Sequence, residues 1–158
     1  MKKIESILFV CLGNTARSPA AEYLAKHYAE LYDLNLKIES AGFINAFSYM
    51  QSQSRSYLSA KNIDYSDFQP QIINRKLIER NDLIITMERN HKVDIINTYR
   101  NIDDIKNKIY TLKEFNGASE DLDIIDPYYT SSRLYSKVLK EIDENVEKLI
   151  LKIKEFNE

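Results

Sequence analysis

Residues 7–19 have the sequence ILFVCLGNTARSP, and this stretch decides the fold class of the chain. Its first four residues are apolar and have the length of a buried strand. Gly13 allows a tight loop, and Ser18 followed by Pro19 is a typical start for a helix, with Ser18 as the predicted N-cap. Apolar residues then recur at helical spacing as far as Leu31. The stretch therefore predicts a strand, a tight loop and a helix in succession.

The rest of the chain continues this alternation. Further strands are predicted at residues 36–40, 83–87 and 109–112, and helices near 51–62, 74–81 and 89–100. An apolar stripe from Tyr135 to Ile153 predicts a long last helix. Alternating elements indicate an α/β fold with a parallel sheet, and such sheets bind ligands beyond the carboxyl ends of their strands. The candidate site is therefore the loop at residues 11–18.

Composition narrows the possible functions. The 158 residues suit one domain, and the 22 basic and 24 acidic residues are mixed along the chain, which favours neither a nucleic-acid nor a membrane partner. Cys11 is the only cysteine, so an intrachain disulfide is impossible and a reducing compartment is expected. No apolar run approaches the ~20 residues of a membrane helix, and the run at residues 7–10 is too short for a signal peptide. We expect a cytoplasmic protein.

The loop at residues 11–18, CLGNTARS, contains the groups needed to bind and attack a phosphoryl group. Successive backbone N–H groups can form an anion nest, and the helix start adds its positive dipole end. Arg17 supplies a planar fork for two phosphate oxygens. The same field stabilises a thiolate on Cys11, to which Ser18 can donate a hydrogen bond. A lone cysteine is often only a buried apolar filler, but an arginine at this spacing favours nucleophilic catalysis.

A second stretch, DPYY at residues 126–129, supplies a candidate general acid. Asp126 follows two isoleucines, and an apolar setting would favour its protonated form before attack and its use as a base afterwards. Pro127 stiffens the segment, while Tyr128 and Tyr129 could form the wall of a slot for a flat side chain. Read alone, Asp-Pro is only a turn signal. Its pairing with the cysteine loop gives it functional meaning.

Residues 11–19 together with residues 126–129 resemble the low-molecular-weight protein tyrosine phosphatases, and the likeness extends over essentially the whole chain. It implies one domain spanning residues 1–158. The implied fold is a phosphatase-I-like, four-stranded parallel sheet in the order 2-1-3-4 with helices on both faces. It also implies that neither a metal nor a cofactor is used.

The resemblance also assigns roles to individual residues. It implies that Cys11 is the nucleophile, Arg17 the phosphate clamp and Asp126 the acid and then the base. Asn14 and Ser40 would brace the loop through hydrogen bonds, with Asn14 in a strained backbone region, and Ser18 would assist the thiolate. The expected substrate-binding residues are Leu12, Gly13, Thr15 and Ala16 in the loop, Phe47 or Tyr49 on one pocket wall, and Tyr128 and Tyr129 on the other.

These residues are compatible with two substrates, phosphotyrosine and phosphoarginine. Thr15 resembles the protein-arginine phosphatases of the same family, whereas Leu12 and the Tyr128-Tyr129 pair favour phosphotyrosine. We favour phosphotyrosine, with phosphoarginine as the alternative. The expected partners are phosphorylated proteins, with inorganic phosphate as product and inhibitor, and the chain is expected to be a monomer.

Functions of other classes fit the sequence less well. A phosphotransfer relay needs neither Arg17 nor a water-activating carboxylate such as Asp126. A phospho-binding module without activity would have lost one of the three catalytic groups, and all three are present. A thiol-dependent arsenate reductase needs further cysteines, and the chain has only Cys11.

Overall fold

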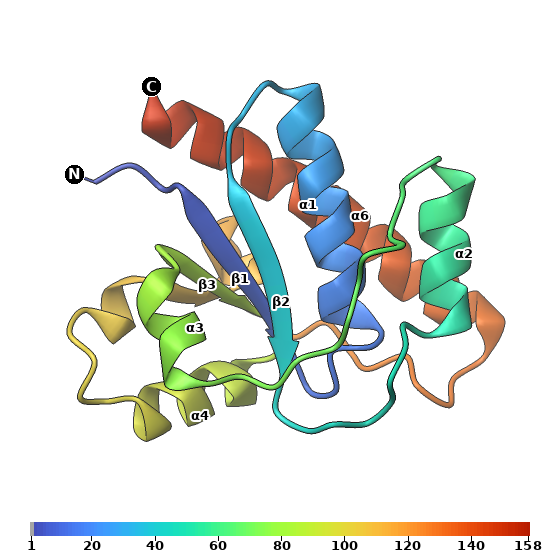
Figure 1. Cartoon of the computed structure of the whole chain (residues 1–158), viewed down its shortest axis with the longest axis horizontal. Coiled ribbons are helices and arrows are strands. Elements are labelled where there is room, and N and C mark those ends of the chain that lie inside the picture. The colour runs from blue at the N-terminus through green and yellow to red at the C-terminus, as the bar shows by residue number, and fades with distance from the viewer. Residues whose placement is uncertain (1) are drawn as a thin grey trace.

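The computed structural model describes residues 2–158 of the chain. Its elements are β1 (Ser6–Cys11), α1 (Arg17–Leu31), β2 (Lys37–Gly42), α2 (Ser52–Ala60), α3 (Arg75–Arg80), β3 (Leu83–Thr86), α4 (Arg89–Thr98), the 3₁₀ helix η1 (Ile105–Asn107), β4 (Ile109–Thr111), α5 (Leu112–Phe115) and α6 (Ser132–Asn157). Figure 1 shows the strands at the centre, with α1, α2 and α6 to one side and α3 and α4 to the other.

The four strands form one parallel sheet in the order β2-β1-β3-β4, which confirms the predicted fold class. Cys11, the last residue of β1, lies opposite Gly42, the last residue of β2. Val10 lies opposite Thr86 at the end of β3. The carboxyl ends of the strands therefore meet at one edge of the sheet, and the loop after β1 emerges there.

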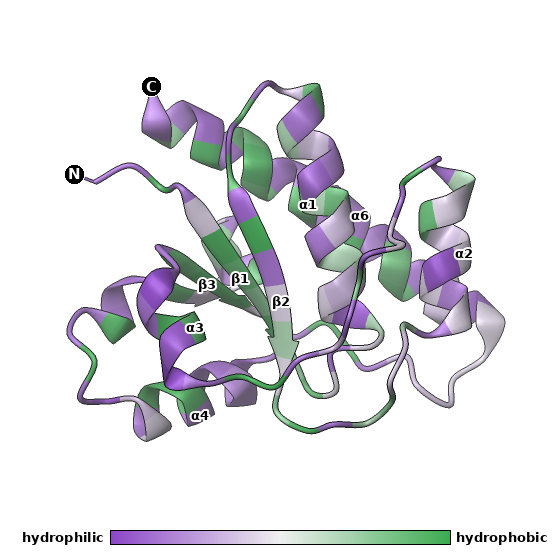
Figure 2. Cartoon of the chain, viewed as in Figure 1, coloured by the Kyte–Doolittle hydropathy of each residue, from purple (hydrophilic) through white to green (hydrophobic). Residues whose placement is uncertain are grey.

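Two apolar cores, one on each face, hold the sheet between its helices. Ile7 and Phe9 of β1 belong to the core beneath α1 and α6, whereas Leu8 and Val10 belong to the core beneath α3 and α4. Because β1 is covered on both faces, its side chains are apolar without alternation. Figure 2 shows the complementary pattern on α6, where hydrophilic and hydrophobic patches alternate along the helix.

Asp143 of α6 ties together the three helices on one face. Its buried carboxylate accepts hydrogen bonds from Tyr28 of α1 and from Tyr57 of α2 (2.6 Å), and Lys61, just beyond α2, lies 3.0 Å away. Burial opposes the ionised form, but these three donors outweigh it and hold the pKa of Asp143 below its ordinary value. The orientation of α2 is thereby fixed relative to α1 and α6.

The observed element boundaries lie within two residues of the predicted ones for α2, α3, α4 and the strands. The prediction of Ser18 as an N-cap is wrong. Helix α1 begins two residues earlier than that cap implies, at Arg17, and Ala16 occupies the cap position without a side-chain hydrogen bond. The Ser18 hydroxyl is engaged by Cys11 and Asn14 instead. The N-cap residue of α1 thus provides no side-chain hydrogen bond to the N–H groups of the first turn.

The short helix α5, which follows β4 directly, was not among the predicted helices. Thr111 accepts a hydrogen bond from the Glu114 N–H, and the Glu114 carboxylate accepts one from the Thr111 N–H. This reciprocal capping box explains how so short a helix forms. Between residues 2 and 158, no helix combines the length and apolar content needed to cross a membrane.

Candidate active site

The loop at residues 12–16 joins the end of β1 to the start of α1 and lies close against the end of β2. The N–H groups of Phe43 and Ile44 both donate to the Leu12 carbonyl, at 2.7 and 3.1 Å. A Cβ atom on Gly42 would lie only 2.7 Å from the backbone nitrogen of Asn14. Glycine at position 42 therefore permits the close approach of β2 to the loop.

Cys11 lies at the base of this loop and contacts Ser18 twice. The Cys11 Sγ lies 2.9 Å from the Ser18 hydroxyl and 3.4 Å from the Ser18 backbone nitrogen, whose N–H donates to it. The Asn14 side-chain amide donates to the Ser18 hydroxyl at 2.9 Å and to the Ser40 hydroxyl at 2.8 Å. Since the Ser18 oxygen accepts from Asn14, its single proton is available to the sulfur.

Asn14 adopts a left-handed backbone conformation with φ of +52°. Its side-chain oxygen accepts a hydrogen bond from the Gln71 N–H at 3.0 Å, and the Gln71 side chain donates to the Ser40 carbonyl at 2.9 Å. Sequence reasoning did not identify Gln71, although Gln71 connects the loop to the chain before α3. Three hydrogen bonds from one side chain hold a backbone conformation that non-glycine residues adopt at a cost.

The hydrogen-bond chain continues from Ser40 to the surface through Glu22, which sequence reasoning also missed. The Ser40 hydroxyl donates to the Glu22 carboxylate at 2.6 Å, and Lys26 lies 2.7 Å from its other oxygen. Burial raises the pKa of Glu22, although the hydrogen bonds from Lys26 and Ser40 oppose it. Ser18, Glu22 and Lys26 recur every four residues on α1, and that spacing was the available signal.

Arg17 is buried, and the Nη1 end of its guanidinium is hydrogen-bonded by other parts of the protein. Its Nη1 atom lies 2.5 Å from a Glu88 carboxylate oxygen and donates to the Ile124 carbonyl at 2.6 Å. Its Nη2 atom lies 3.8 Å from the Asp126 carboxylate. His91 is buried next to Glu88, and its burial lowers its pKa. Glu88 was not predicted, yet it follows β3, whose end lies beside the end of β1.

Asp126 is not in the apolar setting that its neighbours in the sequence suggested. Its side chain is 40% exposed, and it accepts a hydrogen bond from the Tyr128 N–H at 3.0 Å. The preceding Ile124 is buried instead, and its N–H donates to the Met87 carbonyl at 2.8 Å. The segment is thus attached to the end of β3, and Asp126 extends from it toward Arg17.

Aromatic side chains from two segments gather into one cluster. Phe47 lies 5.7 Å from Tyr49 and 5.5 Å from Tyr128 between ring centroids, and Tyr128 lies 4.2 Å from Tyr129. Phe47 and Tyr128 were expected on opposite walls of a pocket, and the structure brings their rings into contact. Tyr129 is 91% exposed and has a left-handed φ of +64°.

The remaining predicted substrate-binding residues are in the loop itself. Leu12 is 40% exposed, whereas Thr15 and Ala16 are buried. Gly13 lies under the segment after β2, because a Cβ atom on it would come within 3.0 Å of the Ala46 Cβ.

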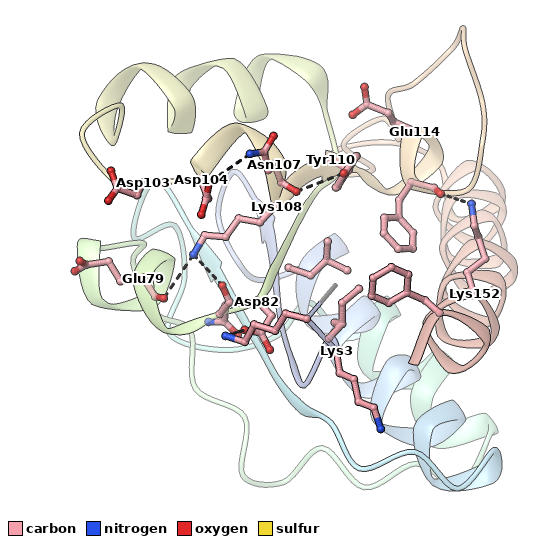
Figure 3. A pocket seen from close by; sticks show the side chains of 16 residues that line it. Lys3, Glu79, Asp82, Asp103, Asp104, Asn107, Lys108, Tyr110, Glu114 and Lys152 are labelled. Atoms are coloured by element: carbon pink, nitrogen blue, oxygen red, sulfur yellow. Dashed lines mark hydrogen bonds and ion pairs between the residues drawn. The ribbon is translucent and has the colours of Figure 1, made fainter. Parts of the chain in front are cut away.

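A hollow of about 830 Å³ lies at the opposite edge of the sheet, lined in part by Asp82 and Lys108 (Figure 3). There the Lys108 ammonium group donates to the carbonyls of Ile78 (2.7 Å) and Asn81 (3.0 Å), at the end of α3. That cation is therefore used to cap a helix. The chemistry-bearing groups are at the Cys11 edge, and we place the candidate active site there.

Comparison with known proteins gives consistent matches over this whole arrangement. The model of a family described as low molecular weight phosphotyrosine protein phosphatase matches residues 6–158. A protein-arginine-phosphatase of Bacillus subtilis is 33% identical over 149 residues, covering 94% of this chain and 96% of that protein. The low molecular weight protein-tyrosine-phosphatase PtpB of Staphylococcus aureus is 30% identical over 153 residues, covering 95% and 97%. The crystal structure of a low molecular weight protein tyrosine phosphatase from T. tengcongensis superposes with a TM-score of 0.83 at 31% identity, covering 94% of this chain and 99% of that one.

Proposed function

Because the chain belongs to the low molecular weight phosphotyrosine protein phosphatase family, whose members are cysteine-dependent phosphatases, we propose that it hydrolyses phosphotyrosine in proteins through a phosphocysteine intermediate on Cys11. One observation carries this proposal. Asp126 and Arg17 lie within 3.8 Å of each other at the edge of the sheet where Cys11 ends β1. A nucleophile, an anion clamp and a proton donor are thus grouped at one loop.

In the first step, the Cys11 thiolate attacks phosphorus, so that a phosphorus–sulfur bond forms and the phosphorus–oxygen bond to the tyrosine breaks. Asp126 gives its proton to the departing phenolate oxygen. In the second step, Asp126 as carboxylate takes a proton from water, whose oxygen attacks phosphorus. The new phosphorus–oxygen bond forms as the phosphorus–sulfur bond breaks, so that inorganic phosphate is released and the Cys11 thiolate is regenerated. The Ser18 hydroxyl donates to the sulfur and so stabilises the thiolate both before attack and as it departs.

Arg17 binds the phosphoryl oxygens with the side of its guanidinium that the protein leaves available. Glu88 and the Ile124 carbonyl both accept hydrogen bonds from Nη1. The Nη2 and Nε groups are therefore the donors that we assign to the phosphoryl oxygens. A guanidinium fixed at one end loses little conformational freedom when it binds an anion in two places. The proximity of Asp126 to Nη2 supports protonation of the leaving group on a phosphate held there.

The aromatic cluster supports phosphotyrosine as the substrate. The exposed rings of Tyr49, Tyr128 and Tyr129, together with the half-buried Phe47, offer surface against which a phenyl group can pack. Each aromatic pair is worth about 0.5–1.5 kcal/mol beyond burial.

Phosphoarginine is the second candidate, and two observations favour it. Thr15 places a hydroxyl group in the phosphate loop, and this hydroxyl could accept a hydrogen bond from a guanidinium. A relative with 33% identity is a protein-arginine-phosphatase. The same two-step chemistry applies, with a guanidinium nitrogen as leaving group.

Further features of the proposal concern location and partners. A reduced Cys11 is needed for attack, and a reducing compartment such as the cytoplasm preserves it. Inorganic phosphate is expected to act as a competitive inhibitor because it fits the same loop. We propose that the monomer is the active form, since every group invoked above comes from one chain.

Rapid acid quenching during turnover of ³²P-labelled phosphotyrosine peptide tests the covalent step. We expect label on Cys11 in the unaltered chain and none in the Cys11→Ser variant, which should still bind vanadate. Turnover without any label on the thiol would contradict the mechanism.

Matched phosphotyrosine and phosphoarginine peptides test the substrate. We expect kcat/KM to favour phosphotyrosine and the Thr15→Ile variant to increase that preference. A higher kcat/KM on phosphoarginine, reduced by Thr15→Ile, would establish the second candidate instead.

A further inference from the structure

We propose that Ser54 and Tyr135 are positioning residues for the phosphate loop, acting together to fix the peptide plane between Ala16 and Arg17. This inference rests on the proposed function, because it assigns the loop at residues 11–18 to binding of the phosphoryl group. Neither residue belongs to the loop. Ser54 lies in the first turn of α2 and Tyr135 in the first turn of α6.

The contact between these residues and the loop is a buried relay of two hydrogen bonds. The Ser54 hydroxyl donates to the Ala16 carbonyl at 3.1 Å and lies 2.7 Å from the Tyr135 hydroxyl. Ser54 is fully buried and Tyr135 is 4% exposed. Since a carbonyl can only accept, the single Ser54 proton goes to Ala16, and Tyr135 must donate to Ser54. The direction of the relay is thus fixed from α6 through α2 to the loop.

The preceding peptide of the loop is held in the same way. The Gln51 N–H, just before α2, donates to the Thr15 carbonyl at 2.8 Å. Two successive carbonyls therefore point out of the loop toward α2. In a trans peptide the carbonyl and the following N–H point in opposite directions. The N–H groups of Ala16 and Arg17 are thereby turned away from α2.

Those N–H groups are donors that an anion nest requires. If the Ala16–Arg17 peptide rotates, the nest loses one donor, and the residue that carries the phosphate clamp changes its backbone direction. Tyr135 remains a proton donor at any physiological pH, because burial raises its pKa to about 12, with the hydrogen bond to Ser54 opposing this rise and the nearby charges of Asp126 and Cys11 adding to it. The relay therefore holds the loop in one arrangement throughout the catalytic cycle.

The test uses Ser54→Ala, Tyr135→Phe and the double variant, with Tyr57→Phe as the matched control. Tyr57 is also a hydroxyl donor on α2, but its hydroxyl donates to Asp143 and not to a carbonyl of the loop, and Tyr57→Phe keeps the ring that packs near Ala16. For each protein we would measure Kd for orthovanadate, kcat and KM for para-nitrophenyl phosphate, and Tm. Vanadate serves as the probe because it reports on the nest without turnover.

We expect Ser54→Ala to weaken vanadate binding and lower kcat/KM by about five- to tenfold, the factor corresponding to one lost hydrogen bond. We expect Tyr57→Phe to lower Tm yet to leave both values within twofold. In the double variant no hydroxyl is left unpaired in the buried site, so Tm should recover toward that of the unaltered chain. Vanadate affinity should nevertheless remain as low as in Ser54→Ala.

Vanadate affinity that follows Tm across the four variants would overturn the inference, because both residues would then be merely structural. Equal vanadate affinity in Ser54→Ala and in the unaltered chain would also overturn the inference. Failure of the proposed function looks different, since the unaltered chain itself would then neither bind vanadate nor hydrolyse the aryl phosphate.

Discussion

Replacement of Asn14 separates two contributions to the shape of the phosphate loop, namely its side-chain hydrogen bonds and its left-handed backbone. Asn14→Ala removes the hydrogen bonds to Ser18, Ser40 and the Gln71 N–H and places a Cβ-bearing residue without compensation at φ of +52°. Asn14→Gly removes the same bonds but tolerates that φ. The difference between the two variants is therefore the backbone cost.

The expected magnitudes follow from these contacts. Three buried hydrogen bonds at about 1 kcal/mol each give a loss of about 3 kcal/mol in the free energy of unfolding for either variant. Alanine in the left-handed region adds about 1 kcal/mol. We therefore expect Asn14→Ala to cost about 4 kcal/mol and Asn14→Gly about 3 kcal/mol. Both should also lower kcat/KM, because the Ser18 hydroxyl loses the donor that directs its proton to Cys11.

Urea unfolding at pH 7 measures these losses, and Asn62 provides the control. Asn62 has a similar φ of +61° but lies in an exposed turn after α2. Asn62→Ala should cost only about 1 kcal/mol, Asn62→Gly close to nothing, and both should retain full activity. If Asn14→Ala costs no more than Asn62→Ala, the hydrogen bonds of Asn14 do not hold the loop and the reasoning is refuted.

Three further predictions concern the acid, the clamp and the helix tether. Asp126→Ala should slow hydrolysis of aryl phosphates with poor leaving groups by about 10²–10⁴-fold but spare activated esters; equal slowing of both would remove its role as acid. Arg17→Lys should weaken phosphate inhibition and kcat together, since an ammonium group cannot satisfy both Glu88 and two phosphate oxygens; near-normal inhibition would mean that another group binds the anion. Asp143→Asn should cost about 2 kcal/mol at pH 7. Because the folded-state pKa of Asp143 is depressed, that cost should be fully present above its unfolded pKa and disappear as the pH falls through the folded value, which urea unfolding at several pH values would show.

The fold could be predicted because its determinants are local. The apolar run at residues 7–10, the glycine loop and the stripe on the last helix each specify one element, and the rules for parallel sheets and the family resemblance supply the rest. Cys11, Arg17 and Ser18 lie within one loop, so their proximity was visible in the sequence. These residues are close in space because they are close along the chain.

Apart from Glu22, which had a local signal on α1, the contacts that sequence reasoning missed join residues far apart in the chain. Glu88 meets Arg17 across 71 positions, and Ser54 meets Tyr135 across 81. A serine or a glutamate at such a position has no local pattern to distinguish it from a surface residue. The prediction of an apolar environment for Asp126 was wrong for a related reason. The side chain of Ile124 turns into the core, whereas the side chain of Asp126, two residues later, turns outward.

The distribution of these contacts along the chain also constrains how the protein is made. The cysteine loop leaves the ribosome within the first eighteen residues, but the carbonyl that supports Arg17 comes from Ile124, 107 positions later, and Tyr135 follows it. A nascent or prematurely terminated chain would therefore carry the reactive thiol without the surroundings that direct it. Synthesis almost to the end is required before the thiol acquires those surroundings, so shortened products should be inert toward phosphorylated proteins.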